Sequence, residues 1–138
     1  MTPRLGILLF AHGARDPAWA LPFQAVAQRL TSRTAEHQGD APAMVTLAFL
    51  EFMSPDIGTA GDQLAAQGCT EVTVVPLFLG AGGHVRKDLP RLIGELAQRH
   101  PQVNWRLSPA VGETDILIQG MADAAWSLAQ PPADTTAP

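Results

Sequence analysis

The stretch Gly6-Ile-Leu-Leu-Phe-Ala-His-Gly-Ala-Arg-Asp-Pro17 decides the fold, because it joins an unbroken apolar run to a polar break. The run at 5–10 has no polar alternation, which is typical of a strand covered on both faces of a parallel sheet. Asp16 and Pro17 match a common helix start, a capping carboxylate followed by proline at the first helical position. The stretch therefore predicts a buried strand, a short loop that carries His12, and a helix.

A second stretch repeats this order further along the chain, as Val72-Thr-Val-Val-Pro-Leu-Phe-Leu-Gly-Ala-Gly-Gly-His-Val-Arg-Lys-Asp-Leu-Pro90. A β-branched run at 72–76 predicts a strand. A loop that contains glycines and His84 follows, and helical spacing of apolar residues begins at 85.

The remaining elements complete a pattern of four strand–helix units. The other strands are predicted at 44–50 and 103–107, and the helices at 18–36, 56–67, 85–100 and from 114 or 115 to about 128. Ser54 and Pro55 are interpreted as a second cap-then-proline start, and Gly68 as a left-handed helix terminator.

This alternation predicts an α/β three-layer sandwich with a four-stranded parallel sheet in the flavodoxin-like order 2-1-3-4. We expect one domain at 1–129 and a disordered tail at 130–138. Ligands of such sheets bind beyond the carboxyl ends of the strands, where the strand order reverses. That point lies between the first and third strands, so the loops at 11–15 and 77–87 bring His12 and His84 to one cleft.

The bulk composition narrows the possible partners. The 138 residues are 46% hydrophobic and 16% charged, enough apolar residues for a core, and the net charge of −4 argues against nucleic acid as a partner. The single cysteine, Cys69, excludes an intrachain disulfide and a multi-cysteine metal site, and we expect it to be a small buried residue. No signal-peptide or membrane-spanning pattern is present, and the expected location is the cytoplasm.

Two imidazoles at one cleft form a partial metal site, because their nitrogens bind divalent transition metals and leave positions open for water or substrate. Glu51, at the end of the second strand, is a candidate third ligand or proton acceptor. The alternatives are that the histidines bond only to backbone and that Glu51 is a helix-entry carboxylate. His37 and His100, at predicted helix ends, are interpreted as structural.

Residues around the histidines could hold the substrate. Arg15, Arg86 and Lys87 would offer cations to a carboxylate- or phosphate-bearing ligand, and the backbone at Gly83 could approach it closely. The alternative is that these three side chains are ordinary solvent-exposed charges that bind no ligand. Several aromatic and methionine side chains near the strand ends could form an apolar wall beside a flat macrocycle, namely Phe49, Phe52, Met53 and Phe78. The alternative for each of them is packing in the core.

The first stretch resembles the opening of the small sirohydrochlorin cobaltochelatases, the CbiX-type class II chelatases, where an apolar strand precedes His-Gly-Ser-Arg-Asp-Pro. Here the motif reads His12-Gly-Ala-Arg-Asp-Pro17, with Ala14 in place of the usual serine. The second stretch is similar to the family's Pro-x-Phe-Leu-x-x-Gly-x-His-x-x-x-Asp-x-Pro. The middle signature is matched by Ala48-Phe-Leu-Glu51 followed by Ser54-Pro55.

The resemblance implies an enzyme, a chelatase of the lyase class, that inserts a divalent metal into the tetrapyrrole sirohydrochlorin. It implies that His12 and His84 handle the metal, with cobalt the leading candidate and nickel or ferrous iron the alternatives. The metal would be a co-substrate, and no organic cofactor is expected. The small family members form homodimers around a shared cavity, so we expect a homodimer here.

Two rival functions follow from the same residues. Histidine phosphatases also place His-Gly after a first strand, but their motif has arginine directly before the histidine, where this chain has Ala11. A non-catalytic metal or tetrapyrrole carrier would need the same ligands as a chelatase. Tight binding without turnover would identify such a carrier.

Overall fold

Four parallel strands form one sheet in the order β2-β1-β3-β4, which confirms the predicted order. The computed structural model describes residues 3–36, 42–80 and 82–132, apart from the side chain of His84. The strands are β1 (Leu5–Ala11), β2 (Met44–Phe49), β3 (Glu71–Pro76) and β4 (Asn104–Leu107). Phe10 pairs with Ala48 on one side and Pro76 on the other, so the carboxyl ends of β2, β1 and β3 lie together.

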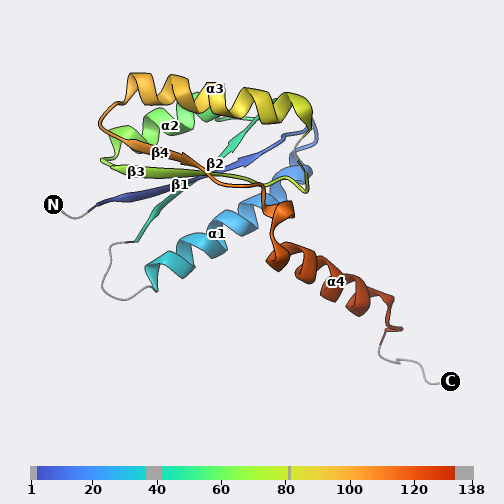
Figure 1. Cartoon of the computed structure of the whole chain (residues 1–138). Helices are drawn as coiled ribbons and strands as arrows, with labels where there is room; N and C mark the ends of the chain where they lie inside the picture. The colour runs from blue at the N-terminus through green and yellow to red at the C-terminus, as the bar shows by residue number, and fades with distance from the viewer. Residues whose placement is uncertain (1–2, 37–41, 81, 133–138) are drawn as a thin grey trace.

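The helices divide between the two faces of the sheet (Figure 1). On one face lie α2 (Ile57–Ala66) and α3 (Gly83–Arg99), and on the other lies α1 (Leu21–Ala35), which follows the 3-10 turn η1 (Pro17–Ala20). After β4 come the 3-10 turn η2 (Val111–Glu113) and α4 (Asp115–Ala129). Figure 1 shows α4 running away from the sheet instead of lying on it.

The core fills the face under α2 and α3. Leu8, Phe10 and Val74 alternate with residues of the opposite face along their strands, and they are fully or almost fully buried against Leu64 of α2 and Leu96 of α3. Burying such a side chain contributes about 1.5–3 kcal/mol to the free energy of folding. Most of the buried apolar residues lie in this cluster, so it is the main hydrophobic core. Cys69 is buried in the same cluster, as predicted, and burial raises the pKa of its thiol.

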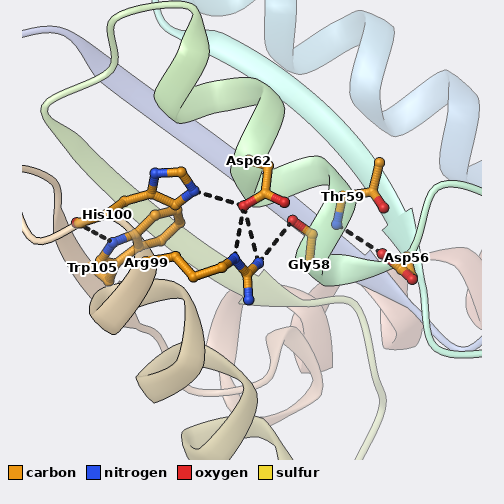
Figure 2. Close-up of polar contacts among 7 residues, drawn as sticks. All are labelled: Asp56, Gly58, Thr59, Asp62, Arg99, His100 and Trp105. Atoms are coloured by element: carbon orange, nitrogen blue, oxygen red, sulfur yellow. Dashed lines mark hydrogen bonds and ion pairs between the residues drawn. The ribbon is translucent and has the colours of Figure 1, made fainter.

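A polar cluster joins the helices that cover this face (Figure 2). Oδ1 of Asp62, on α2, lies 2.6 Å from Nε2 of His100 and accepts hydrogen bonds from Nε and Nη2 of Arg99 at 3.2 and 3.0 Å. We call Asp62, Arg99 and His100 the α2–α3 clasp. The structural role predicted for His100 is confirmed, whereas His37 lies outside the described residues.

Helix starts agree with the sequence at two sites and differ at two others; one agreement is α4, which Thr114 caps as predicted. Asp16 accepts a hydrogen bond from the Ala18 amide, with Pro17 as the first helical residue, as predicted. The predicted cap at Ser54 is wrong: Asp56 caps α2 by accepting from the Thr59 amide, so Pro55 lies before the cap. The third helix begins at Gly83 instead of 85, since Gly82 adopts the extended cap conformation.

The end of the chain is described as far as residue 132, so most of the predicted tail lies outside the described part. The assignment of 1–129 to a single domain stays a prediction. Gly68 has φ of +90°, which confirms it as a left-handed terminator after α2. Within the described residues, no helix is both long enough and apolar enough to cross a membrane.

Candidate functional site

His12 and Glu51 face each other at the carboxyl edge of the sheet. His12 directly follows β1 and Glu51 lies two residues after β2, and these two strands are neighbours. Nε2 of His12 lies 3.3 Å from Oε1 of Glu51, and the side chains are 55% and 49% exposed. A ligand can therefore reach both groups, and the imidazole and carboxylate are close enough to share a proton.

Backbone contacts hold the two loops together beneath these side chains. The amide of Leu50 donates to the carbonyl of Ala11 at 2.9 Å, and the amide of Glu51 donates to the carbonyl of His12 at 3.1 Å. Gly13 has φ of +94°, and a Cβ there would overlap the Glu51 carbonyl. The glycine of the His-Gly pair is thus required by the close approach of the Glu51 loop.

Phe78 supports the His12 ring. The two rings meet edge to face with centroids 6.3 Å apart, and Phe78 packs in the same manner on Phe10 at 5.8 Å. Phe78 is buried in the core, so its described contacts are with protein side chains. Its predicted contact with substrate stays a prediction, while its packing limits the orientations that the imidazole can adopt.

Arg15 and Phe52 form a second exposed feature at the same edge. The guanidinium carbon of Arg15 lies 5.0 Å from the centroid of the Phe52 ring, a cation–π arrangement. Phe52 has φ of 65°, which is uncommon for a bulky residue, and its side chain is exposed. Of the other residues predicted for the apolar wall, Phe49 is buried and Met53 is partly buried, both in the smaller core cluster.

The residues predicted around the second histidine lie in the first turns of α3. Gly83 and His84 are its first two residues, so the prediction that His84 lies in a loop is wrong at the level of the backbone. The segment that leads from β3 to α3 starts at the same edge of the sheet, because the Leu77 amide donates to the Phe10 carbonyl at 2.8 Å. The His84 side chain lies outside the described part, and its distance from His12 stays a prediction.

The cations of α3 have different surroundings. Arg86 forms an ion pair with Glu113 of η2 at 3.0 Å, and Lys87 is exposed on the following position. The pair fastens η2 to the start of α3, together with a hydrogen bond from the Gly112 amide to the Phe78 carbonyl. Glu113 is a partner that sequence reasoning missed, because nothing in the local pattern indicates which loop η2 will meet.

The metal-binding capacity of this edge is partial. Among the described residues, no group of three or more His, Cys, Asp or Glu side chains could hold a metal ion. His12 and Glu51 offer two donors in the described part, which is fewer than a closed structural site uses. Such a set suits an ion that passes on to another ligand more than one that stays in place.

Comparison with known proteins identifies the family. The model of the CbiX family matches residues 6–125. A sirohydrochlorin cobaltochelatase of Priestia megaterium is 29% identical over 133 residues, which cover 94% of this chain and 41% of that protein. One of Saccharolobus solfataricus is 36% identical over 90 residues, covering 65% of this chain and 64% of that protein.

Solved structures agree with the family match. The CbiX protein from Marinobacter aquaeolei VT8 is 31% identical with a TM-score of 0.73, over 90% of this chain and 96% of that one. SirB from Bacillus subtilis, solved with Fe3+, is 23% identical with a TM-score of 0.75, over 93% of this chain and 48% of that one, and shows a shared fold. The chain thus spans about 41–64% of the curated relatives it matches. It belongs to the CbiX family.

Proposed function

We propose that this protein is a sirohydrochlorin chelatase, which inserts a divalent metal, cobalt, into the tetrapyrrole and releases two protons. The observation that carries the proposal is the His12 imidazole facing the Glu51 carboxylate, 3.3 Å apart and about half exposed, at the carboxyl ends of β1 and β2 and beside the point between β1 and β3 where the strand order reverses. Membership of the CbiX family and the cobaltochelatase names of relatives support the choice of reaction. The family match also argues against the histidine-phosphatase alternative.

His12 and His84 hold the incoming ion in this proposal. An imidazole binds a metal through one ring nitrogen, and a carboxylate on the other nitrogen fixes the tautomer and raises the basicity of the ligand. Because Nε2 of His12 faces Glu51, Nδ1 is the nitrogen left for the metal. Two imidazoles hold cobalt without filling its coordination sphere, so the pyrrole nitrogens can replace the remaining ligands.

Glu51 accepts a proton as the metal enters. The macrocycle loses two N–H protons during insertion, and a base in contact with the cleft lowers the barrier to their removal, an effect typically worth roughly 10²–10⁴-fold. Glu51 is half exposed and can pass the proton to water. The second proton goes to the imidazole of His12 or His84 once that ring has released the ion to the pyrrole nitrogens, because the ring then has a free acceptor nitrogen.

The rim of the cleft holds the substrate by its carboxylates. Arg15 and Lys87 offer exposed cations, and Arg86 can share its guanidinium between Glu113 and the substrate. The exposed ring of Phe52 under Arg15 provides an apolar surface for the macrocycle, with Phe78 beneath His12. Gly83, at the start of α3, allows the backbone to approach the ligand.

A second copy of the chain closes the cavity from the other side. One wall of a four-stranded domain covers only one face of a large flat ligand, and a two-fold partner supplies the other. The longer SirB chain carries this fold over about half of its length, a size that leaves room for a second lobe.

The proposed location is the cytoplasm. The single cysteine, which is buried and free, fits a reducing compartment.

The test is an anaerobic insertion assay, followed by absorbance, with sirohydrochlorin and either cobalt(II), nickel(II) or iron(II). Wild type is expected to insert cobalt, and His12→Ala and His84→Ala are each expected to lose at least roughly 100-fold in rate. His100→Ala is the matched control, because this histidine lies in the α2–α3 clasp. Faster insertion of nickel or iron than of cobalt would show that cobalt is not the preferred metal. Tight binding of cobalt without insertion would show that the protein is a carrier and not an enzyme.

A further inference from the structure

We propose that Phe52 positions the Glu51 carboxylate against His12 through a γ-turn of the backbone, and that it does so apart from any contact of its ring with substrate. This role rests on the proposed function, in which Glu51 accepts a proton of the macrocycle. Phe52 acts through Glu51, so it is a positioning residue and not a catalytic one.

The backbone of Phe52 has a conformation that its side chain disfavours. Its φ is 65°, whereas the other positive values of φ in the described part of the chain belong to glycines. The Met53 amide donates to the Glu51 carbonyl at 2.8 Å, so a hydrogen bond between residues two apart closes a γ-turn around Phe52. A γ-turn with a positive φ at its centre is rare and strained. Such strain persists only where the surrounding structure holds it, and it is concentrated at functional sites.

Contacts on both sides of Phe52 hold the turn. On the side that faces β1, the Glu51 amide donates to the His12 carbonyl at 3.1 Å. Gly13, which has no Cβ, leaves room there for the Glu51 carbonyl. On the other side, the Met53 side chain packs against the smaller core cluster. The chain therefore passes from one anchored residue to the next anchored residue through Phe52 alone.

The direction of the Glu51 side chain follows from the two peptide groups that flank its Cα. The first is fixed by the bond from the Glu51 amide to His12, and the second by the bond from the Met53 amide to the Glu51 carbonyl. In this arrangement Oε1 of Glu51 lies 3.3 Å from Nε2 of His12. Because Met53 is anchored, a change of φ at Phe52 must turn the second peptide group, which moves the carboxylate away from the imidazole.

Packing in the core does not explain why a strained residue occupies this position. The Phe52 side chain is 58% exposed, and its ring contacts the guanidinium group of Arg15 at 5.0 Å. Glycine would adopt a positive φ at no steric cost, whereas a β-branched residue resists it. Substitution can therefore separate the backbone of Phe52 from its ring.

Matched variants at this position test the proposal. Phe52→Gly removes the ring and permits the turn, whereas Phe52→Thr removes the ring and resists the turn. Phe52→Val is a second β-branched variant in case Phe52→Thr does not fold, which circular dichroism checks. Steady-state cobalt insertion gives kcat and KM for each variant, with Glu51 present and in the Glu51→Gln background.

We expect Phe52→Gly and Phe52→Thr to raise KM alike, because both lack the ring. The kcat of Phe52→Thr should be at least roughly tenfold below that of Phe52→Gly, since proton transfer depends on the position of the carboxylate. In the Glu51→Gln background the two values of kcat should agree within about twofold, because a residue that acts through Glu51 has no effect once the carboxylate is gone. Equal kcat with Glu51 present, or a tenfold difference that persists in Glu51→Gln, would overturn the proposal.

Crystal structures of the variants separate this role from the proposed reaction. Phe52→Gly should keep the 3.3 Å contact between His12 and Glu51, and Phe52→Thr should lose it, whether or not the protein inserts cobalt. A contact that survives in Phe52→Thr would overturn the positioning role. A wild type that inserts no cobalt would overturn the proposed reaction, and the distances in the crystals would still decide what holds Glu51 in place.

Discussion

Among the residues that the structure describes, two histidine–carboxylate pairs have the same functional groups in different surroundings. His100 and Asp62 lie 2.6 Å apart, the imidazole is 21% exposed, and Arg99 adds two hydrogen bonds to the same carboxylate oxygen (Figure 2). His12 and Glu51 lie 3.3 Å apart, and both side chains are about half exposed. The first pair joins two helices, whereas the second faces solvent at the carboxyl edge of the sheet.

The protein groups around each pair determine whether its imidazole and carboxylate are free to act on a substrate. Asp62 uses its acceptor capacity on protein donors, and the His100 ring packs near Trp105 with centroids 6.2 Å apart. The Glu51 carboxylate faces the half-exposed imidazole of His12, and the loop below them is fixed by backbone contacts. A rigid frame with open side chains is what a substrate-handling site requires.

The largest expected effect comes from removing the charge of one carboxylate at a time. Glu51→Gln should lower the initial rate of cobalt insertion by roughly 10²-fold, since an amide cannot accept the proton of the macrocycle. Asp62→Asn, the matched change in the clasp, should leave the rate within about twofold of wild type, a size of change that corresponds to under about 0.5 kcal/mol. Equal losses in both variants would remove the functional distinction between the pairs.

A smaller effect is expected from the glycine that holds the His12 loop against Glu51. Gly13→Ala puts a Cβ into the Glu51 carbonyl at φ of +94°, so we expect a loss of roughly 1–3 kcal/mol in unfolding free energy. Gly94→Ala is the control, because Gly94 lies inside α3 and a Cβ added there would meet no atom within 4 Å. That change should stabilise the helix by about 0.5–1 kcal/mol. Similar melting temperatures for the two variants would contradict the close approach.

The clasp itself is expected to matter for stability alone. His100→Ala should lower the free energy of unfolding in urea by about 1 kcal/mol, because the hydrogen bond to Asp62 is partly exposed. Gln98→Ala, at an exposed position of the same helix, should change it by less than about 0.5 kcal/mol. A His100→Ala variant that keeps its stability but loses insertion activity would reverse the assignment of the two pairs.

The smallest effect concerns acid pH. The hydrogen bond with His100, and then those from Arg99, hold the pKa of Asp62 below its ordinary value of 3.8. Because the folded-state pKa is the lower one, the stabilisation is present above 3.8 and is lost as the pH falls through the folded-state pKa. Asp62→Asn should therefore show a shallower loss of stability in this acid range, measured by urea unfolding at several pH values. The same pH dependence of unfolding free energy in wild type and Asp62→Asn would contradict this role of the α2–α3 clasp.

Much of the fold follows from local sequence. Unbroken apolar runs predict β1 and β3 as central strands, and the handedness of crossovers leaves few strand orders, one of which is observed. Asp16 and Pro17 mark a helix start because a cap and a proline act within one turn. The meeting of His12 with Glu51 follows from parallel strands that end at one edge.

Other features depend on contacts that no local pattern contains. The glycines at 82 and 83 predict a loop, but Gly82 caps α3 and places His84 in the helix. Ser54 and Asp56 are both good caps, and only the path of the chain selects Asp56. Helical spacing predicts α4 but not its direction, which the contacts of η2 with Phe78 and Arg86 determine.

The position of a bound cobalt ion is the most direct test of the central claim that the exposed pair is the functional one. A crystal of the protein grown with cobalt(II) and measured at the cobalt absorption edge locates the ion by anomalous scattering. We predict cobalt on a ring nitrogen of His12, at a distance of about 2.0–2.2 Å, with His84 as its second protein ligand. Cobalt on His100 and Asp62, with none at His12, would contradict the account.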